Sequence, residues 1–182
     1  MRELSLHIMD LVENSAAAGA TLIHIEVSEQ RKKNRLEITI KDDGQGIPAD
    51  LLKQVVNPFY TTRKTRRGGL GLPLFREASR RCAGDFRIRS EEGEGTEVYA
   101  SFIRDHVDLA PFGDMAATLT SVIVSHPGVD FVYRHHMDGD VFQLDTRDVK
   151  QELKDVPIQH PGVIGFLTRL IRDSLTALRR NR

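Results

Sequence analysis

Two glycine clusters and one amide-bearing helix are the parts of this sequence that could do chemistry. Asn14 follows Asp10 by one helical turn, DDGQGI at 42–47 closes an expected strand, and RGGLGL at 67–72 opens an expected helix. Glycines after a strand let the backbone approach a ligand closely, whereas glycines before a helix leave N–H groups that attract phosphate together with the helix dipole. The order of these three elements predicts a nucleotide-binding site.

The first element reads as an amphipathic helix. Asp10 and Asn14 lie together on a face beside its apolar stripe, and Gly19 is a typical helix stop. The stripe recurs at helical spacing and is formed by Leu4, Ile8, Leu11, Val12 and Ser15. The polar pair is therefore expected beside the core.

Hairpins and further helices must position these groups. The segments TLIHIEVSEQ and RLEITIKDDG alternate with period two around the charged loop EQRKKN, and a second hairpin is expected over residues 84–103. A short helix is expected from Pro48 and a longer one from about Leu70 to Cys82, with the polar, basic stretch TTRKTRRGG between them as a flexible loop. This order predicts an α+β fold in which helices pack on one face of a mixed sheet.

The sequence changes character after Arg104, where DHVDLAPFGDM connects to a small second α+β unit. We therefore expect domains at 1–104 and 105–182. The second unit is expected to contain a helix at 115–125, a hairpin that turns at Asp138-Gly139, and two more helices. The last helix repeats apolar residues broadly enough to require burial in this unit, against the sheet or against a second chain, namely Val163, Phe166, Leu167, Leu170, Ile171, Leu175 and Leu178.

Composition narrows the class of protein. The 182 residues carry 26 Lys plus Arg and 26 Asp plus Glu, so the net charge gives no reason to expect nucleic acid or an acidic membrane as partner. No apolar run is long enough to span a bilayer, and Asp10 interrupts the position of a signal-peptide core. A single cysteine, Cys82, agrees with a reducing compartment, which predicts a cytoplasmic protein.

Five stretches in order now support a family resemblance. DLVENSAAAGAT, DDGQGI, PFYTTRK, GGLGL and GEGTEV resemble the N, G1, F, G2 and G3 boxes of the GHKL ATPase superfamily, which includes histidine kinases, DNA gyrase B, heat-shock chaperones and MutL. The resemblance covers about residues 1–103 and is closest to sensor histidine kinase catalytic domains, because it includes the lid. It implies a Bergerat fold, a two-layer α/β sandwich that binds Mg·ATP.

The resemblance assigns roles to individual residues. Asn14 matches the Mg²⁺ ligand, and its amide oxygen is a hard donor that suits this ion. Asp42 matches the acceptor for the adenine amino group, Gly44 and Gly46 leave room for the base, and Thr96 matches the threonine that supports adenine through water. Asp43 is expected to project elsewhere, as ordinary surface.

Further matches lie around the expected lid. They are Gly69 and Gly71 on the phosphate side, Leu70 and Leu72 as hinge and packing residues, Phe59 in the aromatic box beside the lid, and Lys64 as a lid cation that reaches ATP. Asp10 occupies the position of the general base in the ATP-hydrolysing relatives. Because aspartate is one methylene shorter than the glutamate found there, we expect weak ATPase activity.

A sensor kinase carries a dimerisation helix pair with its phosphoacceptor histidine upstream, whereas 13 residues precede Asn14 here. We therefore expect a kinase-like domain that transfers phosphate to, or reports ATP to, a separate protein partner. His7 is expected to be packed, and the alternating pair His135-His136 to leave at least one ring exposed. A nucleotide-gated binding module without catalysis, an anti-sigma-type serine kinase and a homodimer remain open alternatives.

Overall fold

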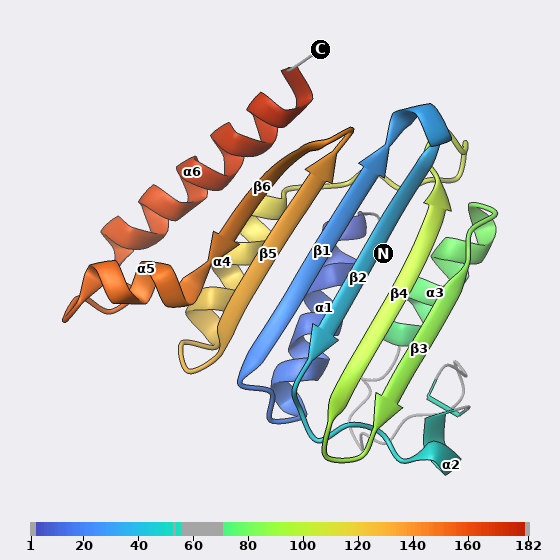
Figure 1. Cartoon of the computed structure of the whole chain (residues 1–182), viewed down its shortest axis with the longest axis horizontal. Helices are drawn as coiled ribbons and strands as arrows, with labels where there is room; N and C mark the ends of the chain where they lie inside the picture. The colour runs from blue at the N-terminus through green and yellow to red at the C-terminus, as the bar shows by residue number, and fades with distance from the viewer. Residues whose placement is uncertain (1–2, 53, 56–70, 181–182) are drawn as a thin grey trace.

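The structure is a computed structural model that describes residues 3–52, 54–55 and 71–180. Its centre is one six-stranded sheet in the order β3-β4-β2-β1-β5-β6 (Figure 1). Neighbouring strands are antiparallel, except that β1 and β5 are parallel. The strands are β1 (Leu22–Gln30), β2 (Arg35–Asp42), β3 (Phe86–Glu91), β4 (Gly95–Ile103), β5 (Asp130–Met137) and β6 (Asp140–Asp145).

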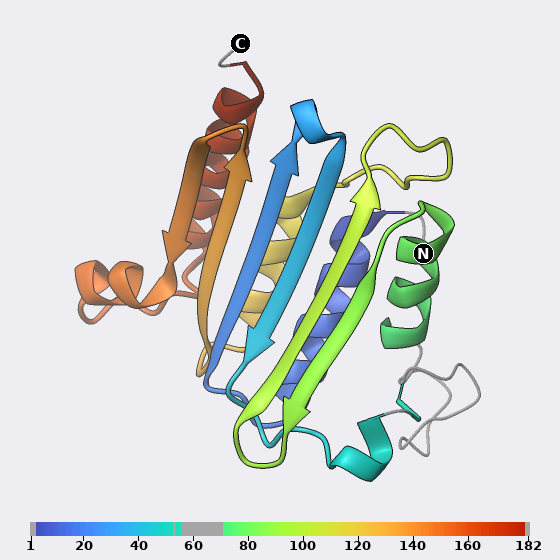
Figure 2. The same ribbon diagram turned by 45° about the vertical axis from the view of Figure 1, so that its right-hand side comes forward.

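Helices cover one face of this sheet, as the turned view in Figure 2 makes clear. Helix α1 lies behind the central strands, α3 lies behind β3 and β4, and α4 and α6 lie behind the β5–β6 side. The helices are α1 (Leu4–Ala17), α2 (Ala49–Leu52), α3 (Gly71–Arg81), α4 (Met115–Ser125), α5 (Thr146–Leu153) and α6 (Pro161–Arg180), with a 3-10 turn at Arg31–Lys33. The predicted α+β sandwich with a mixed sheet is confirmed.

Alternation along the strands decides which side chains enter the core. The apolar residues of β1 and β2 face the helices, and the stripe of α1 packs against them. At each of these positions the exposed fraction is at most 3%, namely at Leu4, Ile8, Leu11, Val12, Ile23, Ile25, Val27, Leu36, Ile38 and Ile40. The sequence periodicity therefore predicted the buried faces correctly.

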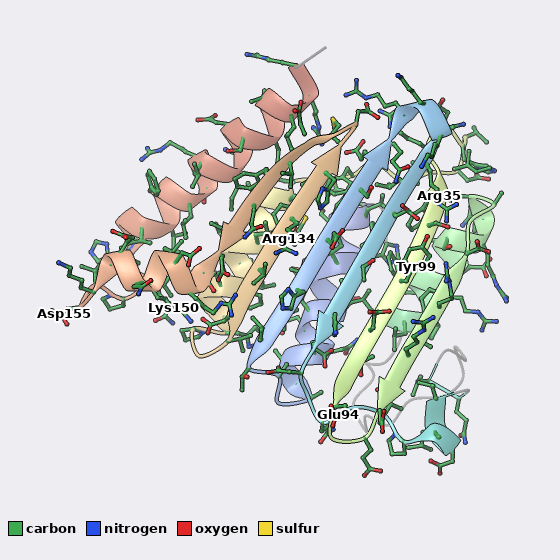
Figure 3. All side chains as sticks on the ribbon, in the orientation of Figure 1. Arg35, Glu94, Tyr99, Arg134, Lys150 and Asp155 are labelled. Carbon is green, nitrogen blue, oxygen red and sulfur yellow. The ribbon has the colours of Figure 1, made fainter. Side chains whose placement is uncertain are left out.

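The opposite face of the sheet is polar, and none of the helices in the described residues covers it over β2, β4 and β3 (Figure 3). Arg35 Nη2 donates a hydrogen bond to the Tyr99 hydroxyl at 2.8 Å, and that hydroxyl donates to Glu37 Oε1 at 2.5 Å. The guanidinium carbon of Arg87 lies 4.5 Å from the centre of the Tyr99 ring. These side chains satisfy one another, so this face is stable in contact with water.

The residues after 104 extend the same sheet. Strand β5 runs parallel to β1 in a register from Leu22 opposite Asp130 to Glu29 opposite Met137. Helix α4 packs beside α1 on the helical face. The domain boundary at residue 104 stays a prediction, and the sheet is continuous across it.

The last helix is amphipathic, and one side of it is buried against α4 and β6. Leu167, Ile171 and Leu175 are at most 8% exposed, whereas Phe166 is 58% exposed and Leu170 is 37% exposed. The surface that α4 and β6 offer is thus narrower than the stripe, and burial of Phe166 and Leu170, for which a second chain was one of the expected partners, stays a prediction. Across the described ranges, none of the helices combines the length and apolar character needed to cross a bilayer.

Candidate nucleotide-binding site

A cavity of about 370 Å³ lies between α1, the end of β2 and the segment that follows β2. Five of the residues selected from the sequence line it, namely Asn14, Asp42, Gly46, Leu72 and Thr96. The remaining described walls are mainly apolar and come from Leu11, Ser15, Ala17, Ala18, Ile40, Gln45, Ile47, Pro48, Leu51, Val55 and Val98. The fold thus gathers residues from distant parts of the chain around one polar floor with apolar sides.

Asp42 forms the polar floor, and its side chain is held by three donors. Oδ1 accepts hydrogen bonds from the backbone N–H of Gly44 at 3.0 Å and of Thr96 at 3.2 Å. Oδ2 accepts a hydrogen bond of 2.5 Å from the hydroxyl of Ser15. Because a carboxylate oxygen has two lone pairs, Oδ2 can still accept one more donor from the cavity.

Ser15 was not selected as a site residue from the sequence, where it counted only as part of the apolar stripe of α1. It is 6% exposed, and it lines the cavity beside Asn14. A hydroxyl within an apolar helical stripe is the signal that could have identified it, since a buried hydroxyl requires a partner. That partner lies on another element and could not be read from the helix alone.

Glycines let the backbone pack closely around this floor. Gly46 has a φ of +69°, and a Cβ atom there would lie 2.0 Å from the carbonyl oxygen of Glu91. Gly95 has a φ of +108°, and its Cβ would lie 2.0 Å from the carbonyl oxygen of Asp42. Both positions therefore require glycine, because side chains rarely adopt this φ and have no space here.

Gly71, the first residue of α3, lies next to the polar pair of α1. A Cβ atom at Gly71 would lie 3.3 Å from Asp10 Cβ and 3.4 Å from Asn14 Nδ2. Burial raises the pKa of Asp10, and the negative charge of Glu13 raises it further. The N-terminal end of α3 is thus close to one carboxyl and one amide, the groups predicted as base and metal ligand.

Asp43 points away from the cavity, as predicted, but it is more than ordinary surface. Its carboxylate accepts hydrogen bonds from Thr21 N at 2.7 Å, Thr21 Oγ1 at 2.6 Å and Leu22 N at 2.9 Å. Burial alone would raise the pKa of Asp43, but the bonds from Thr21 and Leu22 outweigh it and leave the pKa below its usual value. Asp43 therefore anchors the start of β1 to the end of β2.

The predicted positions Phe59, Lys64, Gly69 and Leu70, and the whole predicted loop over 61–69, lie outside the described residues. Their predicted contacts with a nucleotide stay predictions. Of the predicted positions that are described, Gly44 binds the floor through its N–H, and Asp10 and Gly71 lie beside Asn14.

His7 is packed in the core, as expected. Its side chain is 3% exposed, and its ring centre lies 5.5 Å from that of Phe75. Burial lowers the pKa of His7 to about 4, with a smaller contribution from the positive N-terminus. His7 is therefore neutral near pH 7 and inaccessible to a phosphoryl group.

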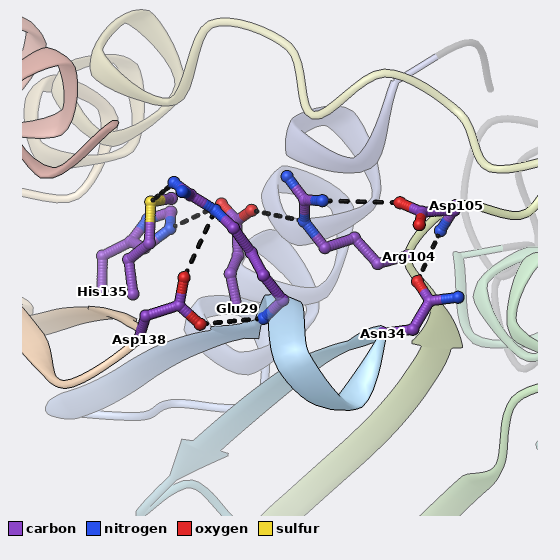
Figure 4. Close-up of polar contacts among 8 residues, drawn as sticks. Glu29, Asn34, Arg104, Asp105, His135 and Asp138 are labelled. Atoms are coloured by element: carbon purple, nitrogen blue, oxygen red, sulfur yellow. Dashed lines mark hydrogen bonds and ion pairs between the residues drawn. The ribbon is translucent and has the colours of Figure 1, made fainter. Parts of the chain in front are cut away.

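The pair His135-His136 alternates across the sheet. His135 is fully buried, and it contacts the Tyr133 hydroxyl at 2.7 Å through Nδ1 and Glu29 Oε1 at 3.0 Å through Nε2. Figure 4 shows how Glu29 continues this chain to Arg104, whose Nε lies 3.4 Å from Oε2. His135 thus joins β5 to β1 inside the protein and has no access to solvent.

His136 occupies the other face of β5. Its Nε2 lies 3.5 Å from Glu26 Oε1, and 40% of its side chain is exposed. This is the polar face of the sheet, whereas the cavity lies on the helical side of β2. His136 is therefore accessible but lies apart from the candidate site.

Comparison with known proteins gives the cavity a context. The chain is 34% identical to a tetrathionate sensor histidine kinase of Salmonella typhimurium over 103 residues, which are 54% of this chain and 17% of that protein. It is 31% identical to sporulation kinase C of Bacillus subtilis over 94 residues, which are 52% of this chain and 22% of that protein. The chain therefore spans about a fifth of the length of these curated relatives.

The fold has a solved counterpart as well. The Aquifex aeolicus MutL ATPase domain complexed with ADP matches with a TM-score of 0.55 and 17% identity, over 85% of this chain and 68% of that one. The family model described as histidine kinase-, DNA gyrase B-, and HSP90-like ATPase matches residues 2–106, the part that contains the cavity and all five sequence boxes. The chain belongs to the histidine kinase-, DNA gyrase B- and HSP90-like ATPase family.

Proposed function

We propose that the cavity binds ATP, with Asp42 recognising the 6-amino group of adenine. The observation that carries this proposal is the buried carboxylate of Asp42, 7% exposed, at the floor of an apolar cavity. Three donors already fix its orientation, and Oδ2 retains capacity for one more. An exocyclic amino group supplies the donor that this oxygen lacks, and the flat faces of a purine ring suit the apolar walls.

The size of the cavity supports a base in the enclosed part and phosphates further out. At about 370 Å³ it is near the lower end of ligand pockets, which span roughly 300–1,000 Å³. The N-terminus of α3 lies beside Asn14 at one side of the cavity. N–H groups at the start of a helix attract phosphate, so the triphosphate is expected to run toward Gly71.

The residues present also fit a magnesium ion bound together with the nucleotide. Asn14 offers an amide oxygen at the cavity wall, while Asp10, one helical turn away, is the proposed base. Mg²⁺ prefers oxygen ligands and usually keeps several waters and substrate phosphates, so one or two protein ligands suffice. When bound, the ion would neutralise phosphate charge. Asn14 would fix the position of the ion, and the carboxylate of Asp10 would be a proton acceptor nearby.

The further proposal is transfer of the γ-phosphoryl group to a separate protein in the cytoplasm. Similarity to sensor histidine kinases supports it. The three histidines His7, His135 and His136 favour an external acceptor over themselves, because His7 and His135 are buried and His136 lies on the opposite face of the sheet. Two alternatives remain, a binding module gated by ATP and an anti-sigma-type serine kinase.

One experiment separates these readings. The purified protein is incubated with Mg²⁺, ATP labelled at the γ-phosphate and cell extract, with the Asp42→Asn variant as control. A labelled second protein that depends on Asp42 is expected, with acid-labile label for histidine or aspartate and acid-stable label for serine. Tight ATP binding without any transferred label would instead support the non-catalytic module.

A further inference from the structure

The hydroxyl of Ser90 on β3 is a junction between the floor of the cavity and its wall. It accepts a hydrogen bond from the backbone N–H of Ile47 at 2.7 Å. It donates to the carbonyl oxygen of Gly95 at 2.8 Å, and it lies 2.8 Å from the hydroxyl oxygen of Thr96. Ile47 and Thr96 both line the cavity, so Ser90 contacts two lining residues from behind.

The protons around Ser90 can be assigned by elimination. A serine hydroxyl has one proton and two lone pairs. The carbonyl of Gly95 can only accept, so it takes that proton, and the N–H of Ile47 can only donate, so it fills one lone pair. When all three contacts are hydrogen bonds at once, the remaining lone pair receives the proton of Thr96. Thr96 therefore directs its O–H at Ser90, so that its hydroxyl oxygen can only accept a hydrogen bond from any other partner.

With this assignment, the side chains of Asp42 and Thr96 can both act only as acceptors toward a ligand. Asp42 and Thr96 are adjacent there, because the Thr96 N–H donates to Asp42 Oδ1 at 3.2 Å. A base with an amino group at this end supplies a donor, whereas a base with an oxo group brings a third acceptor. An acceptor that faces only acceptors is left without a hydrogen bond, which disfavours binding.

We infer that Ser90 is a positioning residue that makes this end of the cavity select a 6-amino purine over a 6-oxo purine, by orienting the hydroxyl of Thr96. The inference rests on the proposed nucleotide binding. Ser90 acts through Thr96 and is not itself among the residues that line the cavity.

A purely structural role for Ser90 is the alternative to distinguish. Its bond to Ile47 also holds the segment after β2, together with the bond from Gly93 N to the Gln45 carbonyl at 2.9 Å. Loss of that anchorage would weaken every nucleotide by a similar factor. Loss of the orientation of Thr96 would change the ratio between amino and oxo bases, because the freed hydroxyl could donate to an oxo group.

The test measures calorimetric affinities for Mg·ATP and Mg·ITP, which differ in the amino or oxo group at position 6 and in N1, an acceptor in adenine and an N–H donor in hypoxanthine. The wild type is expected to prefer ATP. Ser90→Ala should reduce the ATP-to-ITP affinity ratio by roughly two- to ten-fold, the range of one neutral hydrogen bond. Ser90→Thr keeps the hydroxyl and should keep the ratio. Ser28→Ala, on β1 outside the cavity, is the matched serine control and should leave the ratio unchanged.

A second background isolates the route through Thr96. In Thr96→Val, which keeps the backbone N–H to Asp42, adding Ser90→Ala should leave the ratio unchanged, because the effects of coupled residues do not add. If Ser90→Ala does not fold, Ser90→Cys replaces it, since a thiol is a weaker acceptor and should give an intermediate ratio.

Three results would overturn the inference. They are an equal loss of ATP and ITP affinity in Ser90→Ala, a change of ratio that persists in Thr96→Val, and a wild type that binds ATP but does not prefer it over ITP. A wild type that binds neither nucleotide would instead remove the proposed function, and the inference with it.

Discussion

The hydroxyl of Ser15 on α1 donates a hydrogen bond of 2.5 Å to Oδ2 of Asp42 at the end of β2, across 27 positions of sequence. Both residues are buried, with exposed fractions of 6% and 7%. The bond ties the helix that carries Asn14 to the strand that forms the cavity floor. The proposed metal ligand and the proposed base-recognition residue are therefore held in one fixed arrangement before any ligand binds.

Removal of this bond should cost stability. Ser15→Ala leaves one oxygen of a buried carboxylate with no donor from the described residues, so we expect the free energy of unfolding to fall by about 1–3 kcal/mol. Urea denaturation measures the change. Ser28→Ala is the control on the polar side of β1, and a change within about 0.5 kcal/mol is expected there. Equal effects of both substitutions would show that the Ser15 bond has no special weight.

The close backbone contact at Gly46 gives a second prediction. Gly19 and Gly46 both have positive φ, at +77° and +69°, but a Cβ atom at Gly19 would meet nothing within 4 Å. Gly19→Ala should therefore cost only the backbone strain, about 1 kcal/mol. Gly46→Ala should cost clearly more, because its Cβ would overlap the carbonyl of Glu91, and thermal unfolding compares the two. Similar losses of stability in Gly19→Ala and Gly46→Ala would contradict the close contact between Gly46 and the carbonyl of Glu91.

His7 predicts how stability depends on pH. Its pKa falls from 6.5 in the unfolded chain to about 4 in the folded protein, so its contribution is fully present above pH 6.5 and is lost as the pH falls toward 4. The loss amounts to at most about 3 kcal/mol. In His7→Gln the free energy of unfolding should decline less between pH 7 and pH 4 than in the wild type, whereas exposed His160→Gln should retain the wild-type slope. Parallel slopes in all three proteins would refute this assignment.

Asp10 gives a prediction about hydrolysis, conditional on ATP binding. If it is the base, it works when deprotonated, and its raised pKa means that the ATPase rate should rise with pH through a value above the usual aspartate range. Asp10→Asn should abolish the residual hydrolysis and leave ATP binding within about two-fold, while Asp10→Glu should increase the rate through longer reach. A brisk ATPase that is insensitive to Asp10→Asn would exclude this role.

Much of the fold followed from periodicity. The alternation of Ile23, Ile25 and Val27 identified the buried face of β1, and Asp138-Gly139 gave the turn of the β5–β6 hairpin, where both residues have positive φ. Local patterns could not reveal that β5 pairs in parallel with β1, because such pairing depends on long-range contacts. The exposure of Phe166 could not be read from the helix either, since it depends on how much surface the neighbours provide.

The residues of the candidate site also fall into two groups, those that local motifs identify and those whose role depends on distant partners. Asn14, Asp42 and Thr96 were found because their motifs are local, and the structure brings them to one cavity. Ser15 and Ser90 were missed because their importance lies in partners 27 and 43 positions away, Asp42 and Ile47. Asp43 was misjudged as ordinary surface for the same reason, as its partners Thr21 and Leu22 start another strand. Hydrogen-bond partners across elements are the part of a site that sequence spacing does not specify.

The most direct test of the central claim is calorimetric titration of the purified protein with Mg·ATP, repeated for Asp42→Asn and for Asp43→Asn as its neighbouring control. Saturable binding is expected in the wild type, with an affinity about ten-fold or more lower in Asp42→Asn, where an amide replaces part of the acceptor. Asp43→Asn should bind ATP like the wild type, because Asp43 points away from the cavity and holds Thr21. Absence of ATP binding in the folded wild type, or unchanged affinity in Asp42→Asn, would contradict the account.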